Sequence, residues 1–347
     1  MVNVGIVGIG FMGMIHYLSY ERIRGAKVRA LCEKETKRLA GDWRDIKGNF
    51  GPAGRQMDLS GIETTDNFDD VLGDPQINLV DICLPPALHA DFAVKALRAG
   101  KHVFCEKPIA LSTADARRMV REAEKQKRLL MIGHVLPFNP EYAYAYKQVA
   151  GGKYGKLLGG HFKRIISDPL WLKGFYDPRK IGGPLLDLHV HDAHFIRLLC
   201  GIPIAVFSRG RTRGEVVEFL TTQFMFDDPR LSVSAASGVI YQQGRAFTHA
   251  FEIYLEKAAI LFDFAVIGDA GRLATPVTLL DSRGKVHQPE MGSGDPVEAF
   301  VAELTAVVKA VRTGKPAPLL AADLARDAVI MCRKQSDSVF RGRAVKI

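Results

Sequence analysis

The sequence has few cysteines and no long apolar run. Its 347 residues include five cysteines (Cys32, Cys83, Cys105, Cys200 and Cys332), and no two of them form a C-x-x-C pair. We therefore expect reduced thiols, most simply core residues. No apolar stretch approaches the ~18 residues that a membrane span needs. The first strand begins at once and leaves no room for a signal peptide, so we expect a cytoplasmic protein that does not span a membrane.

No nucleic-acid-binding motif accompanies the positive charge of the chain. The formal net charge is +9, but the basic residues are spread along helix-like segments such as 114–128 and in the tail at 341–343. We expect general attraction for anionic ligands and no nucleic-acid partner. With 47% hydrophobic and 24% charged residues the chain resembles ordinary globular proteins, and its length suits two domains.

A glycine-rich turn lies at the start of the chain. Residues 2–7 form an apolar, β-branched run, which is typical of a parallel strand buried on both faces. Gly8, Gly10 and Gly13 follow with the spacing G-x-G-x-x-G, and a helix-like run covers 11–23. In a dinucleotide site the first glycine permits the turn, the second admits the pyrophosphate, and the third lets the helix pack on the strand. The N–H groups at the helix start would face the phosphates.

An acidic residue follows at the expected distance. The next predicted strand, 28–32, ends at Glu33, which comes 20 residues after Gly13. An acid at this position binds the ribose hydroxyls of NAD and would repel the 2′-phosphate of NADP. We predict NAD as the cofactor, and Lys34 directly after Glu33 keeps NADP possible.

Strand and helix patterns alternate up to residue 133. Further strands are predicted at 62–65, 79–84, 102–105 and 129–132, with helices at 87–99 and 113–127 and with N-caps at Asn67 and Ser112. Six strands separated by helices predict a doubly wound parallel sheet of Rossmann type, in an α/β fold.

Beyond His134 the pattern favours a mostly antiparallel sheet. Alternating segments lie at 157–167, 206–213, 216–226, 231–240 and 251–264, and helices are expected at 142–149, 187–199, 296–312 and 321–339. We predict a Rossmann domain at 1–133 and an α+β domain for substrate binding and oligomerisation at 134–347, with helix 321–339 packing back near the first domain. The helices are too few to cover both faces of an open-faced sheet with long apolar strands, which predicts a homodimer or homotetramer.

One motif at the end of the fifth predicted strand is specific. Glu106-Lys107-Pro108 resembles the E-K-P motif of the glucose–fructose oxidoreductase, inositol dehydrogenase and rhizopine-catabolism family (Gfo/Idh/MocA). The segments 84–89, 99–103, 182–187 and 313–316 also match this family. The resemblance implies that Lys107 donates to a substrate oxygen beside the nicotinamide, that Glu106 braces the loop, and that the Lys107–Pro108 peptide is cis. Together, the turn and the resemblance predict these cofactor-binding residues: Gly8, Gly10, Phe11, Met12, Gly13, Glu33, Lys34, Leu84, Pro85, His89, Glu106 and Lys107.

A second group of polar residues lies at 187–194. On a helix, Asp187, His191 and His194 would share one face. The resemblance implies that Asp187 and His191 act with Lys107: His191 takes or gives the hydroxyl proton, and Asp187 holds a substrate hydroxyl or orients the imidazole. The same face also permits a three-ligand metal site. We predict a polar substrate pocket and no metal.

The sequence departs from the family pattern at three positions. His189 stands where glycine is usual, His194 where aspartate is common, and Pro137 where arginine is frequent. The resemblance implies an NAD(P)-dependent oxidoreductase that transfers a hydride to or from a hydroxyl-bearing carbon of a sugar, a cyclitol or a related small molecule. Two alternatives stay open: a hydrolase or isomerase that retains NAD, and a non-catalytic regulator that binds the cofactor.

Overall fold

The computed structural model describes residues 1–292 and 294–347, which form two compact units. Unit 1 comprises Met1–Asn139 and Ser293–Arg326, and unit 2 comprises Pro140–Gly292 and Asp327–Ile347. The division differs from the predicted one because the chain returns to unit 1 after the second sheet. Helix α8 (Val297–Thr313) packs against α1 (Phe11–Tyr20) of unit 1.

Unit 1 contains the predicted doubly wound parallel sheet. Its strand order is β3-β2-β1-β4-β5-β6, and all five pairings are parallel. The strands are β1 (Val2–Val7), β2 (Ala26–Cys32), β3 (Glu63–Thr65), β4 (Leu79–Ile82), β5 (His102–Glu106) and β6 (Leu130–Gly133). β1 and β4 are neighbours at the centre, and the chain moves outward from them in both directions. This reversal creates the crevice in which open α/β sheets bind ligands.

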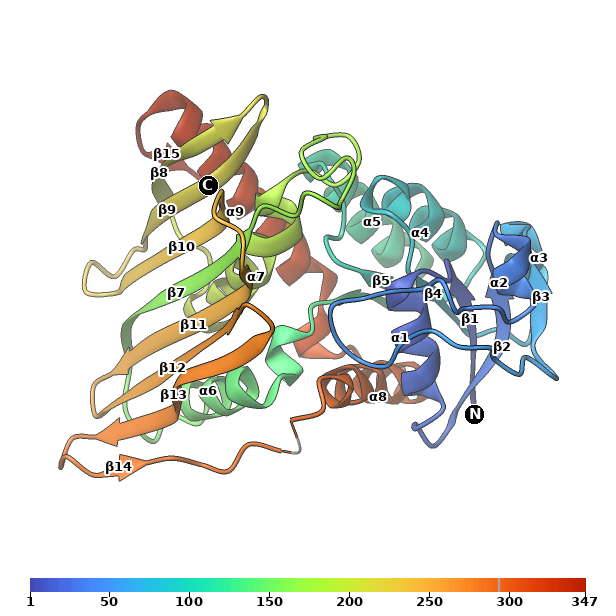
Figure 1. The fold of residues 1–347 in the computed structure, drawn as a ribbon, viewed down its shortest axis with the longest axis horizontal. Coiled ribbons are helices and arrows are strands. Elements are labelled where there is room, and N and C mark those ends of the chain that lie inside the picture. Colours follow the sequence, from blue (N-terminus) through green and yellow to red (C-terminus); the bar gives the residue numbers. More distant parts are fainter. Residues whose placement is uncertain (293) are drawn as a thin grey trace. The chain divides into compact units, whose positions relative to one another are not determined.

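Helices cover both faces of this sheet. Right-handed crossovers in opposite directions place helices on opposite sides, so that α1 packs with α8 and α4 packs with α5 (Figure 1). The remaining helical segments are α2 (Thr36–Leu39), α3 (Phe68–Gly73), η1 (Pro86–Leu88), α4 (His89–Arg98), α5 (Thr113–Gln126), η2 (Leu136–Phe138) and η4 (Pro318–Leu320). The side chains of Asn67 and Ser112 accept hydrogen bonds from the N–H groups of Asp69 and Asp115, which confirms both predicted N-caps.

Unit 2 contains a nine-stranded sheet in the order β14-β13-β12-β11-β7-β10-β9-β8-β15. Only β7 and β10 pair in parallel, so the mostly antiparallel prediction is confirmed. The predicted single segment 251–264 is wrong, because the chain reverses at Glu256-Lys257 between two strands. The strands are β7 (Leu157–Ser167), β8 (Ala205–Arg213), β9 (Val216–Met225), β10 (Ser232–Ile240), β11 (Arg245–Leu255), β12 (Ala258–Ile267), β13 (Ala270–Asp281), β14 (Val286–His287) and β15 (Val345–Lys346).

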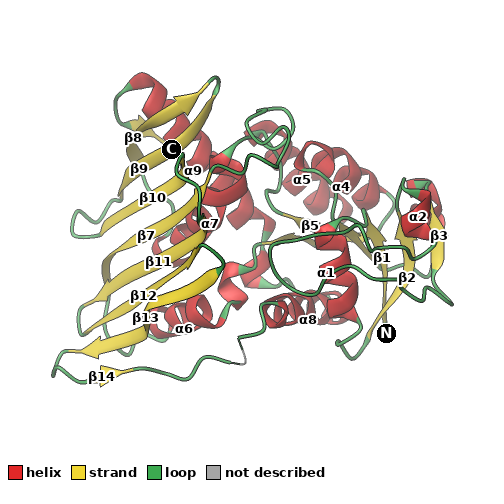
Figure 2. Ribbon diagram, viewed as in Figure 1, coloured by secondary structure: helices red, strands yellow, loops and turns green. Residues whose placement is uncertain are grey.

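The helices of unit 2 lie on one face of its sheet (Figure 2). They are α6 (Pro140–Ala150), the π-helical turn η3 (Leu185–His189), α7 (Val190–Cys200) and the main part of α9 (Ala322–Arg341). On β9, Leu220 and Phe224 are buried whereas Thr221 and Gln223 are exposed, so the apolar side of the strand faces the helices. On the open side of this strand, Phe219 and Met225 are partly exposed next to Thr221 and Gln223, so this side carries both polar and apolar side chains. Within the described parts of the chain, no helix has the length and apolar character that crossing a membrane requires.

Candidate functional site

The predicted residues of unit 1 gather at the carboxyl ends of three adjacent strands. Val7 pairs with Ile82, and Ile82 pairs with Cys105, so β1, β4 and β5 end at the same edge of the sheet. The segments that follow these strands begin with the glycine-rich turn, with Leu84-Pro85 and with Lys107. Three separate parts of the sequence thus meet where an open parallel sheet binds its ligand.

The three glycines of the turn have different surroundings. Gly8 has φ +92°, and a Cβ atom there would lie 2.7 Å from the Cys83 carbonyl oxygen. A Cβ atom at Gly13 would lie 2.0 Å from the Gly8 carbonyl oxygen, so helix α1 could not pack as closely on the turn. A Cβ atom at Gly10 would meet no atom within 4 Å. The open space beside Gly10 fits the close approach of a pyrophosphate.

The start of α1 is open to an anion. Its N-cap is Gly10, which supplies no capping side chain, and the first turn contains no acidic residue. Phe11 packs edge-on against Phe50 with ring centroids 4.8 Å apart, and Met12 packs with an apolar cluster that includes Val297. Both residues therefore offer a ligand chiefly their backbone N–H groups, which suit a phosphate at a helix N-terminus.

Glu33 lies directly beside the turn. Its Oε2 accepts a hydrogen bond from the Ile9 N–H at 2.7 Å, and its Oε1 accepts one from the Lys34 N–H at 2.7 Å. These bonds hold a negative charge next to the glycines. The Lys34 side chain is exposed. Sequence reasoning missed Arg38, whose Nη1 donates to the Ile9 carbonyl oxygen at 3.1 Å and lies 3.9 Å from Glu33 Oε2.

His89 is buried between two loops of unit 1. The residue is 0% exposed, its Nδ1 lies 2.8 Å from the Pro108 carbonyl oxygen, and its Nε2 lies 2.7 Å from the Leu84 carbonyl oxygen. Burial lowers the pKa of the imidazole, although both carbonyl contacts act to raise it. Both nitrogens lie within hydrogen-bond distance of these carbonyl oxygens, so His89 connects the loops after β4 and β5.

The Glu106-Lys107-Pro108 segment begins at the last residue of β5, and its Lys107–Pro108 peptide is cis. Glu106 is nearly buried, and its Oε2 accepts a hydrogen bond from the Lys107 N–H at 3.2 Å. The Lys107 residue itself is half-buried. Glu106 thus braces the backbone of the loop, while Lys107 stays accessible at the edge of the sheet.

The predicted face of Asp187, His191 and His194 is only partly present in unit 2. Asp187 lies in the π-helical turn η3 rather than on the α-helix, so the spacing of 100° per residue does not extend to it. Asp187 and His191 are half-buried, whereas His194 is 1% exposed. Burial and the nearby Arg197 lower the pKa of His194 to about 3. The structure thus keeps His194 as a neutral core residue and leaves Asp187 and His191 accessible.

Buried polar residues of unit 2 form hydrogen bonds next to the segment 187–194. Arg164 Nε donates to Asp192 Oδ2 at 2.8 Å, and both side chains are buried. His189 is also buried, and its Nε2 lies 2.8 Å from Gln335 Nε2 and 3.2 Å from Gln335 Oε1. Burial lowers the pKa of His189. His189 therefore connects η3 to α9 through Gln335. This contact gives a structural role to the histidine at position 189, where the family usually has glycine.

Donor atoms with metal-ligand spacing occur in unit 1. In the described part of the chain, one group of three potential ligands brings its donor atoms within 4.8 Å of one another, and it consists of His16, Asp81 and Cys83. This group lies in unit 1 and does not include the face at 187–194. Sequence reasoning did not find it, because a lone histidine in an apolar helix and an aspartate inside a buried strand carry no spacing signal.

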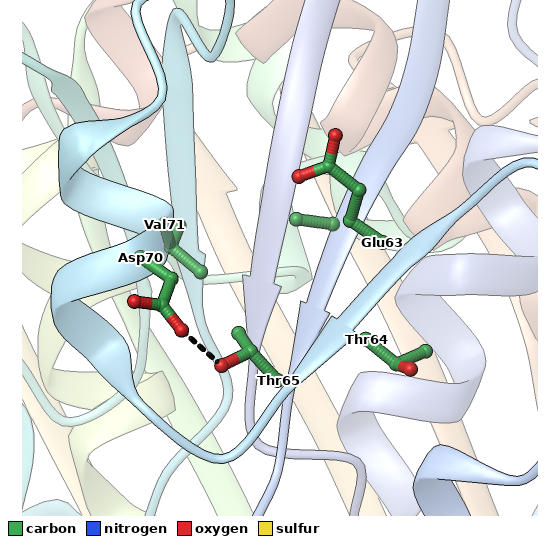
Figure 3. A pocket seen from close by; sticks show the side chains of 6 residues that line it. Glu63, Thr64, Thr65, Asp70 and Val71 are labelled. Carbon is green, nitrogen blue, oxygen red and sulfur yellow. Dashed lines mark hydrogen bonds between the residues drawn. The ribbon is translucent and has the colours of Figure 1, made fainter.

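A small pocket lies at the β3 edge of unit 1 (Figure 3). It is lined by Ala30, Glu63, Thr64, Thr65, Asp70 and Val71. The Thr65 hydroxyl donates to Asp70, and Arg29 donates to Glu63, so both carboxylates of the pocket are already bonded. None of the lining residues belongs to the predicted cofactor or catalytic set.

The parallel sheet, its glycine-rich turn and the acid after β2 define a dinucleotide-binding protein. Residues 2–134 match the model of the oxidoreductase family with an NAD-binding Rossmann fold, and residues 142–261 match the C-terminal domain of the same family. The chain belongs to the Gfo/Idh/MocA family of oxidoreductases, as the resemblance predicts.

Relatives with dehydrogenase names align with this chain. Myo-inositol 2-dehydrogenase of Thermotoga maritima is 26% identical over 365 aligned residues, which cover 100% of this chain and 98% of that protein. Levoglucosan dehydrogenase of Pseudarthrobacter phenanthrenivorans is 30% identical over 216 residues, 58% of this chain and 51% of that protein. A levoglucosan dehydrogenase structure in complex with NADH has a TM-score of 0.81 at 22% identity and covers 100% of this chain and 99% of its own. At this identity the structural likeness shows the fold alone.

Proposed function

We propose that this protein is an NAD-dependent dehydrogenase that acts on a hydroxyl-bearing carbon of a sugar or cyclitol. The observation that carries the proposal is the arrangement at one edge of the parallel sheet, where an open glycine turn follows β1 and Lys107 follows β5, on either side of β4. The names of the relatives, which include inositol and levoglucosan dehydrogenases, support the substrate class.

We assign separate tasks to three residues. NAD, when bound through the glycine turn and Glu33, would accept or return a hydride. Lys107 donates a hydrogen bond to the reacting oxygen of the substrate. His191 takes the hydroxyl proton during oxidation and returns it during reduction, and Asp187 orients the imidazole or holds a neighbouring hydroxyl. The partial exposure of all three side chains supports these assignments.

The test begins with a panel of polyols and sugars, with NAD reduction followed by absorbance. For an active substrate, we expect His191→Ala and Lys107→Met to lower kcat by about 10²–10⁴-fold, while NADH affinity changes little. Lys125→Met, which removes an exposed lysine on α5, is the matched control and should keep full activity. Wild-type turnover in His191→Ala would exclude the proposed proton transfer. Net product without added NAD would indicate a hydrolase or isomerase, and cofactor binding without any turnover would indicate a regulator.

We also propose that NAD is preferred over NADP because of Glu33. A carboxylate fixed by the Ile9 and Lys34 N–H groups would repel a 2′-phosphate by ~1–3 kcal/mol at an effective dielectric constant of about 20. Glu33→Gln should therefore improve NADPH binding relative to NADH by about 10-fold or more in titration calorimetry. An unchanged ratio of the two affinities would assign the preference to other residues.

A homo-oligomer and a cytoplasmic location complete the proposal. The helix-free face of the described unit 2 sheet supports association between copies, since exposed sheet faces are commonly covered in this way. The five unpaired cysteines favour a reducing compartment. Light scattering that gives the monomer mass of 38.2 kDa at micromolar concentration would contradict the oligomer.

A further inference from the structure

Unit 1 buries an unusual group of titratable side chains. His16 on α1, Asp81 on β4 and Glu303 on α8 are each 0% exposed, and Glu106 on β5 is 7% exposed. Carboxylates are costly to bury unless a cation or a proton compensates them. The chain brings three of them to a single imidazole from three separate elements.

The His16 ring lies between two of these carboxylates. Its Nδ1 lies 3.0 Å from Asp81 Oδ2, and its Nε2 lies 3.2 Å from Glu106 Oε1. Nδ1 is hydrogen-bonded to Asp81, and Glu106 lies within ion-pair distance of Nε2, so a carboxylate next to each nitrogen suits an imidazolium. Burial lowers the pKa of His16, but Asp81 and Cys83 raise it, and the net pKa lies well above 6.5.

The remaining groups around His16 are neutral or apolar. Burial, reinforced by Glu106, raises the pKa of Glu303 well above its usual range, so this side chain keeps its proton. Burial likewise raises the pKa of the Cys83 thiol, and burial raises that of Tyr20. The rings of Phe104 and Phe300 pack against the imidazole at centroid distances of 5.6 and 6.2 Å. A proton on His16 therefore places one positive charge between the Asp81 and Glu106 carboxylates.

Glu106 contacts both His16 and the backbone of the loop at Lys107. While Oε1 faces His16, Oε2 accepts the hydrogen bond from the Lys107 N–H. On the other side, a Cβ atom at Gly133 of β6 would lie 2.8 Å from Glu106 Oε1, so only a glycine leaves room for the carboxylate. The contacts with His16 and with the Lys107 N–H thus hold the Glu106 carboxylate in one orientation.

We propose that His16 is a positioning residue for Lys107: held by Asp81, it fixes the Glu106 carboxylate, which in turn fixes the backbone at Lys107. The contacts Asp81–His16–Glu106–Lys107 connect residues of β4, α1 and β5 to the loop that begins at Lys107. This link rests on the proposed function only in that Lys107 is the group that it positions.

A metal ion is the rival occupant, because His16, Asp81 and Cys83 have donor atoms within 4.8 Å of one another. The distances favour a proton. Nδ1 of His16 lies 3.0 Å from Asp81 Oδ2 and 3.1 Å from Cys83 Sγ, which are hydrogen-bond distances.

Amide hydrogen exchange at Lys107, measured by NMR on the full-length protein, tests the link without a substrate. We expect His16→Leu to speed exchange of the Lys107 amide at least about 10-fold and His16→Gln, which keeps a donor, to speed it less. Ser19→Ala is the matched control, because Ser19 is equally buried on α1 but bonds only the Ile15 carbonyl oxygen. If His16→Leu does not fold, Glu106→Gln weakens the same link and should give the same local effect.

Three results would overturn the proposal. They are Lys107 exchange no faster in the His16 variants than in Ser19→Ala, a neutral His16 ring at pH 7 in nitrogen NMR spectra, and a stoichiometric metal ion in the purified protein. For an active substrate, His16→Gln should lower kcat by about 10-fold while the KM and the NADH affinity stay within about twofold. If no substrate is ever turned over, the proposed function fails, while the exchange and NMR results still decide the role of His16.

Discussion

Alanine at Gly10 and alanine at Gly13 should separate the ligand-binding role of the turn from its packing role. Gly10 has φ −85° and ψ −162°, an extended conformation that alanine adopts freely, and its added Cβ atom would meet nothing within 4 Å. Removing a glycine from the unfolded chain stabilises the fold by ~0.4–1 kcal/mol at a compatible site. Gly10→Ala should therefore fold with equal or slightly greater stability.

The expected loss in Gly10→Ala is in cofactor binding. The methyl group would occupy the open space through which the pyrophosphate approaches the backbone. We expect NADH affinity to fall about 10-fold or more, equivalent to ~1.4 kcal/mol. Gly13→Ala should show the opposite pattern. Its Cβ atom at 2.0 Å from the Gly8 carbonyl oxygen must displace α1 by more than about 1 Å, at an overpacking cost of ~1–3 kcal/mol.

Urea unfolding without cofactor and fluorescence titration with NADH measure the two effects independently. The proposed placement of the pyrophosphate would be refuted if Gly10→Ala bound NADH as tightly as the wild type. A Gly13→Ala protein as stable as the wild type would show that α1 tolerates a wider separation from the turn than the structure implies.

Three further outcomes follow from buried groups. Asp192→Asn removes the carboxylate that pairs with the buried Arg164, so urea unfolding should show a loss of ~3–5 kcal/mol. The raised pKa of Glu303 means that the folded state holds a proton that the unfolded state releases above pH ~4.5, so this group costs stability as pH rises. Glu303→Gln should flatten the decline of unfolding free energy above pH ~4.5 by up to about 1.4 kcal/mol per pH unit, and a parallel curve would contradict the shift. The lowered pKa of His194 has the opposite sign: its stability contribution is present above pH ~6.5 and is lost on acidification, so His194→Gln should reduce acid destabilisation between pH 6.5 and about 3 in the same assay.

The parts of the fold that depend on local pattern were predictable. The first strand, the glycine turn and the N-caps at Asn67 and Ser112 each depend on residues a few positions apart. The acid at Glu33 follows from a fixed spacing within one strand–helix–strand unit, and the structure places it against the turn. The E-K-P motif likewise follows its predicted strand.

Predictions that assumed a regular element or a simple chain order were less accurate. An α-helical face through Asp187 assumed 100° per residue, and the π-helical turn at Leu185–His189 removes that spacing. A single segment at 251–264 ignored the reversal at Glu256-Lys257, which apolar alternation on both sides conceals. The surroundings of His89 were not predictable either, because its ring nitrogens lie next to the carbonyl oxygens of Leu84 and Pro108, in two loops that only the fold brings together.

The sequence by itself determined the cofactor class, the parallel sheet and the family, because each depends on residue types at short, regular spacings. Only the tertiary structure decided that α8 returns to pack on α1, and that His16, Asp81, Glu106 and Glu303 share one buried site. These four residues are up to 287 positions apart in the chain. Their electrostatic coupling depends on distance in space and on exclusion of water, and neither quantity is encoded in the spacing of residues along the chain.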